Sequence, residues 1–174
     1  MTVAVDTISR YALRWADEHL DSTAYTTRCL AFVDDAIERA NEVEIFGGDY
    51  AGESADLYGA THTADPAPPG AFVFYRSVGD IEGIRRDWGH VGLSMGDGHV
   101  IHAWDSVRVD EASALASLSL APGWEPLSFR GWTPLSRILE GSRPATWTTD
   151  AATAAAHQQA QWLEQDRRGS APTR

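Results

Sequence analysis

Three histidines, His90, His99 and His102, fall within one short stretch, WGHVGLSMGDGHVIHAW at 88–104, which is richer in histidine than any other part of the chain. Imidazole changes its charge near neutral pH, so histidine serves as a general acid and base and as a metal ligand. The chain also has a single cysteine, Cys29, which forms no intrachain disulfide and is the natural candidate for a nucleophile. Thiol chemistry requires that the fold bring this cysteine to one of these imidazoles.

The loop Gly96–Gly98 decides whether two of the histidines can cooperate. A two-residue turn would place His90 and His102 on opposite faces of the hairpin, because a shift of one residue moves a side chain to the other face. A three-residue loop, with its last glycine in a left-handed G1 bulge, pairs His102 with Gly92 and His90 with Trp104. Both imidazoles then share one face, and the glycine leaves space for them. The sequence therefore permits a contact between the two histidines, conditional on this bulge.

The third histidine is expected to lie elsewhere. With the three-residue loop, His99 lies opposite Met95 and close to the turn. It then faces the same side of the hairpin as the apolar residues Val91 and Leu93. We therefore exclude His99 from the expected site.

Two helices are predicted in the first part of the chain, from about 6 to 20 and within TTRCLAFVDDAIERAN at 26–41. In the second of these, apolar residues recur at helical spacing and the charged residues take the opposite side. Thr26 or Thr27 is the natural cap of this helix. Cys29 is thereby placed in the first turn, on the face that points toward the interior.

A thiol in the first turn of a helix is close to unpaired backbone N–H groups and the positive end of the helix dipole. With a neighbouring imidazole, such a position is expected to lower the pKa of the thiol to about 3.5–7.5. The scheme that follows has Cys29 attack a carbonyl, His90 act as base and then as acid, and His102 hold the His90 ring. The backbone N–H of Cys29 is then available to an oxyanion hole.

The remaining elements predict an α+β fold in which N-terminal helices pack on an antiparallel β-meander. The predicted elements are a helical turn at 54–58, a strand at 71–75, a polar loop at 76–88, two strands around the Gly96–Gly98 loop, strands at 107–109 and 127–132, and a helix at 149–164. Residues 164–174 are expected to fray or to be disordered. We therefore expect a catalytic domain at 1–148, followed by a C-terminal helix and tail at 149–174.

The charge of the chain limits its partners. The 174 residues carry 25 Asp and Glu against 14 Lys and Arg, a formal net charge of −11. A nucleic acid or an anionic membrane requires a cationic surface, so both are disfavoured, whereas peptide-like substrates remain open. No cofactor and no metal is expected.

We expect neither a signal peptide nor a membrane-spanning stretch from this sequence. This leaves a cytoplasmic location or export by a route without a signal, through phage lysis or a secretion apparatus. If the chain is a delivered effector, an inhibitor or immunity protein is an expected partner.

The order of these motifs resembles the NlpC/P60 family of papain-like cysteine peptidases, which is related to the CHAP amidases. The resemblance lies in Cys29 at a helix start, PGAFVFY at 69–75 and GHVGLSMGDGHVIHA at 89–103, and it covers roughly residues 11–138. It implies a papain-like fold in which Cys29, His90 and His102 are the nucleophile, the base and the orienting polar residue. The implied activity is cleavage of an amide bond in bacterial cell-wall peptide through an acyl-enzyme.

The chain departs from the family pattern at two positions that concern substrate recognition. Members that cut stem peptides typically have an Asp-Cys-Ser-Gly run, where this chain has Arg28-Cys29-Leu30-Ala31. The usual acidic residue after the glycine of the first strand motif is Ala71. These changes put stem-peptide specificity in doubt more than catalysis.

Four residues are candidates for substrate binding. Tyr25 is at the position where the family often has an aromatic residue in the cleft, and a plain packing role is about as plausible. Arg28, beside the nucleophile, would favour a substrate with a carboxylate. Trp88 and Trp104 flank the histidine hairpin and are expected near the cleft.

Three alternatives remain open at this point. The same three residues would support acyl transfer to an amine instead of water. Cys29, His90 and His102 also resemble a zinc set with an open position, although no carboxylate that would support the ligands is obvious. A binding module that keeps the fold without turnover is the third.

Overall fold

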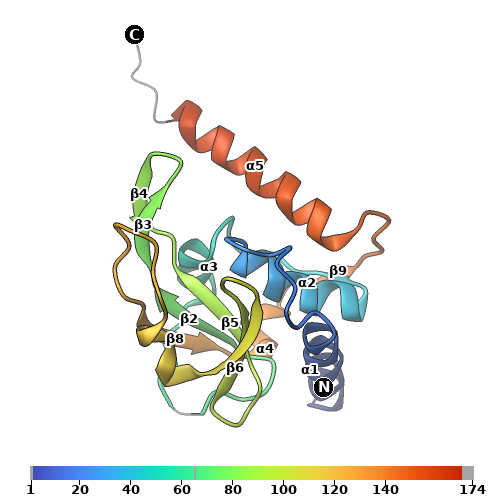
Figure 1. Cartoon of the computed structure of the whole chain (residues 1–174). Helices are drawn as coiled ribbons and strands as arrows, with labels where there is room; N and C mark the ends of the chain where they lie inside the picture. The colour runs from blue at the N-terminus through green and yellow to red at the C-terminus, as the bar shows by residue number, and fades with distance from the viewer. Residues whose placement is uncertain (1, 65, 170–174) are drawn as a thin grey trace.

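A five-stranded antiparallel sheet forms the centre of the structure, a computed structural model that describes residues 2–64 and 66–169. The strand order is β7-β6-β5-β2-β8, so β5, β6 and β7 form a meander and β2 lies between β5 and β8. The strands are β2 (Phe72–Arg76), β5 (His90–Ser94), β6 (His99–Ala103), β7 (Val107–Glu111) and β8 (Ser128–Thr133). The expected α+β class, with an antiparallel meander, is confirmed (Figure 1).

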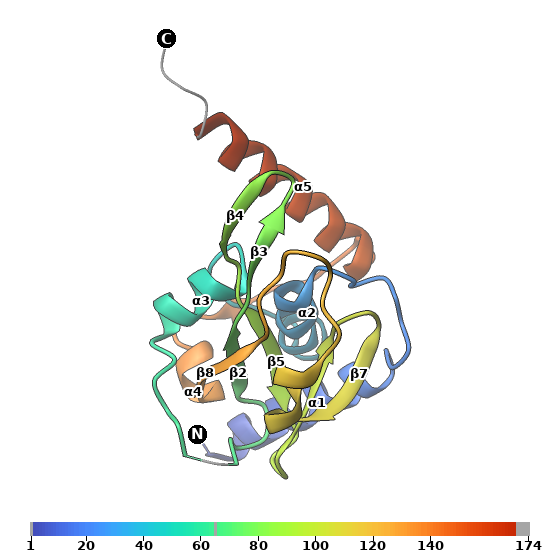
Figure 2. The same ribbon diagram turned by 60° about the vertical axis from the view of Figure 1, so that its left-hand side comes forward.

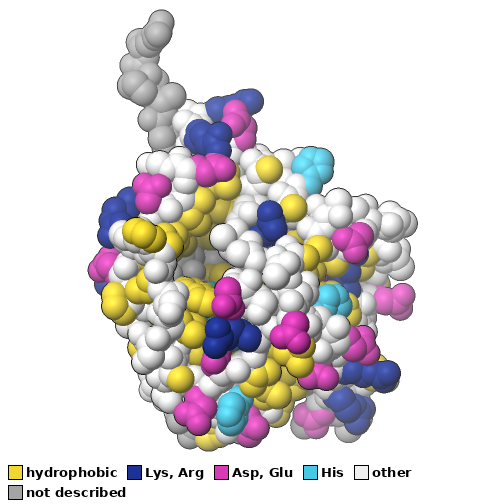
Figure 3. All heavy atoms as spheres, in the orientation of Figure 1, with side chains coloured by type: hydrophobic (Ala, Val, Ile, Leu, Met, Phe, Trp, Pro, Cys, Tyr) yellow, Lys and Arg dark blue, Asp and Glu magenta, His cyan; other side chains and the backbone are white. Residues whose placement is uncertain are grey.

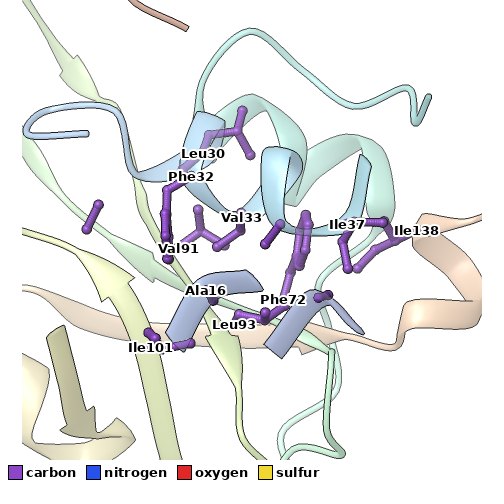
Figure 4. Close-up of a cluster of buried hydrophobic side chains, with 14 of the residues drawn as sticks. Ala16, Leu30, Phe32, Val33, Ile37, Phe72, Val91, Leu93, Ile101 and Ile138 are labelled. Carbon is purple, nitrogen blue, oxygen red and sulfur yellow. The ribbon is translucent and has the colours of Figure 1, made fainter. Parts of the chain in front are cut away.

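Two N-terminal helices, α1 (Thr2–Asp17) and α2 (Cys29–Asn41), pack on this sheet. The first begins and ends a few residues earlier than its apolar spacing predicted, and the second begins at the cysteine. Figure 4 shows how the side chains of α2 point toward the strands, in a cluster that includes Phe32, Val33, Ile37, Phe72, Val91 and Leu93. Burial of each large apolar side chain contributes about 1.5–3 kcal/mol, so this cluster fixes α2 against the sheet.

Short elements complete the fold around the sheet. The predicted helical turn is a helix of two turns that begins three residues earlier than expected. These elements are β1 (Val43–Glu44), α3 (Ala51–Tyr58), the 3-10 helix η1 (Ala112–Ser117), α4 (Leu135–Ile138) and β9 (Arg143–Pro144), with β1 and β9 paired.

The segment predicted as a polar loop, 76–88, instead forms a β-hairpin of β3 (Val78–Ile81) and β4 (Ile84–Asp87). Its two-residue turn has positive φ at both Glu82 (51°) and Gly83 (86°), and the Gly83 N–H donates to the Asp80 carboxylate at 2.8 Å. This is the geometry of a type I′ turn, which matches the twist of the two strands. The prediction of a loop was wrong because this ribbon, which projects from the sheet in Figure 2, has few apolar residues to signal a strand.

The last helix, α5 (Ala151–Gly169), is longer than the predicted one. Residues 164–169 continue the helix, so the predicted fraying of this part is wrong, and residues 170–174 lie outside the described residues. Within residues 2–64 and 66–169, none of the helices combines the length and the apolarity that a membrane span needs.

Helix α5 crosses the molecule from α2 to the β3–β4 hairpin, as both ribbon views show (Figures 1 and 2). Its Trp162 ring lies against Trp88, with centroids 5.7 Å apart, and its Asp166 carboxylate pairs with Arg86 of β4 at 3.1 Å. Leu163 on the same helix is buried. The terminal helix is therefore packed onto the domain that carries the candidate site.

Candidate active site

The register of the histidine hairpin is the one that the three-residue loop predicts. Strands β5 and β6 pair Leu93 with Ile101 and Ser94 with Val100. The Met95 N–H donates to the His99 carbonyl at 2.9 Å, and Gly98 has φ of +90°. The loop therefore has the expected length, with a left-handed glycine at its end.

His90 and His102 are in direct contact on one face of the sheet. His90 Nε2 lies 2.9 Å from His102 Nδ1, and the two rings meet edge to face with centroids 5.0 Å apart. Both are buried, at 3% and 0% exposure. A Cβ on Gly92 would lie 3.2 Å from the Cβ of His102, so the glycine provides the space that the sequence indicated.

His99 lies apart from this pair, as expected. Its Nδ1 lies 3.2 Å from the Asp97 carboxylate at the hairpin turn, and 42% of its side chain is exposed. His99 therefore belongs to the exposed turn and not to the buried site.

A carboxylate that the sequence reasoning missed, Asp110, extends the histidine pair. Its Oδ2 lies 2.9 Å from His102 Nε2 and 2.7 Å from Arg108 Nε, and its Oδ1 accepts from the second arginine nitrogen at 3.1 Å. The predicted strand stopped at residue 109, whereas β7 continues to Glu111. The alternation in VRVDE was the available signal, because in an extended strand residues 108 and 110 face the same side.

The buried network fixes the charge of its members. Burial lowers the pKa of His90 well below its ordinary value, and the neighbouring His102 lowers it further. Burial also lowers the pKa of His102 and outweighs the opposing effect of Asp110. Burial alone would raise the pKa of Asp110, but hydrogen bonds from Arg108 and His102 bring it below its ordinary value. At neutral pH both imidazoles are therefore neutral and Asp110 is ionised.

Cys29 is the first residue of α2, as the sequence indicated, but the predicted caps are wrong. The residue before the helix is Arg28, which makes no capping hydrogen bond with its side chain, and Thr27 has a left-handed φ of 66°. The amides of this first turn are therefore left without a side-chain cap. The cysteine itself is free and half-buried.

The environment of the thiol differs from the expectation of a preformed thiolate. Burial raises the pKa of Cys29 to about 11, although the backbone amides of Val91, Leu30 and Cys29 itself act to lower it. The expected low pKa is wrong for this state, because desolvation of a charged sulfur outweighs the amides at the helix start. The amide of Val91 that reaches the thiol belongs to the residue after His90. The thiol is neutral at rest and lies against the start of the strand that carries the base.

Cys29 and His90 open into one cavity of about 770 Å³. Its walls come from the start of α2, the segment before α3, the β3–β4 hairpin, the loop after β6, residues 119–124 and α5. The residues between β4 and β5 complete the wall. Four tryptophans line the cavity: Trp88, Trp104, Trp124 and Trp162. Figure 3 shows this side of the molecule hollowed below α5, with hydrophobic side chains along the hollow.

Three of the four predicted substrate-binding residues line the cavity: Arg28, Trp88 and Trp104. Arg28 donates to the Ala24 carbonyl at 3.0 Å, and the Trp88 indole donates to the Gly79 carbonyl at 3.1 Å. The Trp104 ring stands at 88° to His90 with centroids 5.2 Å apart. Trp104 thus packs against the His90 ring at the wall of the cavity.

Tyr25 is not among the described residues that line the cavity. It is 1% exposed, and its hydroxyl donates to the Asp35 carboxylate at 2.8 Å. Its burial and its bond to Asp35 favour the packing role, the other interpretation that the sequence allowed, and a contact of Tyr25 with substrate stays a prediction.

The described residues contain no set of side chains that would support the zinc alternative. No group of three or more His, Cys, Asp or Glu side chains there is arranged to hold a metal ion. His90 Nε2 and His102 Nδ1 face one another at 2.9 Å, so a hydrogen bond joins these two nitrogens. The arrangement is that of two hydrogen-bonded imidazoles.

No protein-family model and no curated protein matches this chain. The functional conclusion therefore depends on the geometry and chemistry of the site.

Proposed function

We propose that this protein is a cysteine hydrolase that cleaves an amide bond through Cys29, His90 and His102. The observation that carries the proposal is the buried His90–His102 hydrogen bond of 2.9 Å beside a cavity that also holds the only cysteine of the chain. A thiol, a neutral imidazole and a third group that holds the imidazole are the parts that nucleophilic acyl chemistry needs.

The first half of the reaction transfers the acyl group to sulfur. His90 takes the proton of the Cys29 thiol as the sulfur attacks the substrate carbonyl, and a tetrahedral intermediate forms. The backbone N–H groups at the start of α2 lack a side-chain cap, and we expect them to stabilise its oxyanion. The C–N bond then breaks, the amine leaves with the proton from His90, and a thioester remains on Cys29.

The second half returns the enzyme to its starting state. His90 takes a proton from a water molecule as its oxygen attacks the thioester, and the thiolate leaves and regains a proton from His90. The product is a carboxylic acid. Because burial raises the pKa of Cys29 to about 11, proton transfer to His90 accompanies the attack in this scheme instead of preceding substrate binding.

The resemblance to the NlpC/P60 family supports a papain-like assignment of the fold and a bacterial cell-wall peptide as the substrate. The cavity supports a peptide-like ligand, because its wall combines aromatic faces with polar groups, as binding sites for organic ligands usually do. Arg28 replaces the acidic residue that precedes the cysteine in stem-peptide enzymes, so the substrate is expected to differ from theirs near the scissile bond.

The proposal is tested by incubation of the protein and its Cys29→Ser variant with purified muropeptides, followed by mass spectrometry. The wild-type protein is expected to produce fragments whose masses gain one water across the cut bond, and the variant is expected to produce none while it remains folded. Hydrolysis that persists without the thiol would overturn the proposal. If a free amine is added and the product carries that amine in place of water, the same residues act in acyl transfer.

A further inference from the structure

Two hydrogen bonds run in series from His90 through His102 to Asp110, and the direction in which each one donates is fixed. An ionised carboxylate only accepts hydrogen bonds, so the 2.9 Å contact between Asp110 Oδ2 and His102 Nε2 requires the proton to be on His102 Nε2. A neutral imidazole has one N–H, and His102 Nδ1 is therefore an acceptor. His90 Nε2, at 2.9 Å from this nitrogen, must then be the donor.

The consequence reaches the nitrogen that does the chemistry. If neutral His90 carries its proton on Nε2, its Nδ1 has a free lone pair and is able to accept the proton of a thiol. Protonation of His90 adds a hydrogen only at Nδ1 and leaves the rest of the chain unchanged. The reverse direction, with His102 donating from Nδ1, would put the single proton of His90 on Nδ1 and remove the base.

We propose that Asp110 is a positioning residue that selects the tautomers of His102 and His90 and so directs the basic nitrogen of His90 toward the reaction. This inference rests on the proposed function for its catalytic meaning, whereas the tautomers themselves are a property of the folded protein. The sequence resemblance assigns no role to Asp110.

Arg108 holds this carboxylate in place and keeps it ionised. Its Nε and a terminal nitrogen donate to the two oxygens of Asp110 at 2.7 and 3.1 Å, in a bidentate pair. The Asp110 side chain is 18% exposed and that of Arg108 is 36% exposed, so the network reaches solvent on the arginine side, away from the buried His102. Arg108 also makes a longer contact of 3.5 Å with Asp105.

The direct test is ¹⁵N NMR of the histidine rings in the free protein, with His90 and His102 assigned by substitution. The expected wild-type spectrum has the proton on Nε2 and a bare Nδ1 in both rings. In Asp110→Ala, His102 Nε2 has no carboxylate to donate to, and the neighbouring Arg108 side chain only donates hydrogen bonds. The proton of His102 is therefore expected to move from its Nε2 to its Nδ1. Protons on Nδ1 of both rings in the wild-type protein would overturn the inference.

A kinetic test uses acylation by p-nitrophenyl acetate, with Cys29→Ser as the background. Asp110→Ala is expected to lower kcat at least about tenfold with KM within about twofold, and Asp110→Glu to restore part of the loss. The matched control is Glu111→Ala, which removes the adjacent, exposed carboxylate of the same strand and is expected to leave the rate unchanged. Equal rates for Asp110→Ala and wild type would overturn the inference.

The outcomes separate the two proposals. If the wild-type protein shows no acylation of Cys29, the proposed function fails and the tautomers measured by NMR still decide the role of Asp110. If Asp110→Ala does not fold, the inference is tested by the wild-type spectrum and by the Arg108→Ala variant. The latter is expected to keep both tautomers at neutral pH and to lose them at a higher pH than wild type on acidification, because the pKa of Asp110 rises without the arginine.

Discussion

Gly92 lies directly across from His102, and a Cβ at position 92 would come within 3.2 Å of the Cβ atoms of both His102 and Val100. This distance is tighter than ordinary van der Waals contact. The buried imidazole pair therefore depends on the absence of a side chain on the opposite strand, and the hairpin has a glycine at that position for a steric reason.

A Gly92→Ala variant is expected to push His102 away from His90. The added methyl group overpacks a buried site, which typically costs about 1–3 kcal/mol of unfolding free energy. Urea unfolding measures this loss, and acylation of Cys29 is expected to fall with it. Gly98→Asn is the control, because nothing lies within 4 Å of a Cβ at that turn and asparagine tolerates a left-handed backbone. Wild-type stability in Gly92→Ala would contradict the steric role.

Tyr25→Phe separates packing from substrate binding. The variant removes the hydroxyl that donates to Asp35 at 2.8 Å in a buried position, so we expect a loss of about 1–2 kcal/mol in stability. Turnover measured below the melting temperature is expected to stay at the wild-type level. A raised KM with unchanged stability would restore Tyr25 as a substrate-binding residue.

The pH dependence of Cys29 alkylation tests the resting state of the thiol. Because burial raises the pKa of Cys29 to about 11, its thiolate fraction at about pH 8 is about 100-fold smaller than that of a thiol with the ordinary value of 9.0. The rate with iodoacetamide is expected to rise about tenfold per pH unit from about pH 7 to 10, since only the thiolate reacts. The same protein unfolded in urea is the reference. A plateau below about pH 7 would indicate a preformed ion pair with His90 and contradict this description.

Opening of the cavity is expected to depend on the ion pair between Asp166 of α5 and Arg86. The two side chains are 32% and 29% exposed, and pairs of this kind contribute about 0.5–1 kcal/mol. Asp166→Ala should therefore increase hydrogen exchange in α5, and the rate of Cys29 labelling by the bulky N-phenylmaleimide, about two- to fivefold.

The matched control is Arg168→Ala, which removes an ion pair to Glu164 that stays within the helix. Both variants lose one charged side chain of α5, but only Asp166→Ala removes a contact with the β3–β4 hairpin, to which the ion pair between Arg167 and Glu82 also holds the helix. Equal effects of the two substitutions would show that α5 is not held over the cavity by this contact.

The central hairpin was predictable because its geometry is local. The glycines at 96 and 98 favour a three-residue loop, and the length of this loop fixes the register in which β5 and β6 pair. That register places His90 and His102 on the same face of the sheet. The position of Cys29 was predictable for a similar reason, since the apolar spacing of α2 locates its first turn.

The rest of the site depends on contacts that no local pattern carries. Asp110 was missed because β7 is longer than its apolar residues indicate, and the role of α5 was missed because Trp162 and Trp88 are far apart in sequence. The direction of the Cys29 pKa shift is opposite to the prediction, because position at a helix start does not reveal how deeply the sulfur is buried. Tertiary packing decided each of these features.

The most direct test of the central claim is the mass of the intact protein after a short exposure to p-nitrophenyl acetate, with the modified residue located by peptide mapping. We predict one acetyl group on Cys29 in the wild-type protein, slow acetylation in His90→Ala, and no adduct at position 29 in Cys29→Ser. Release of p-nitrophenol at the same rate by wild type and Cys29→Ser, with no acetyl group on Cys29, would contradict the claim.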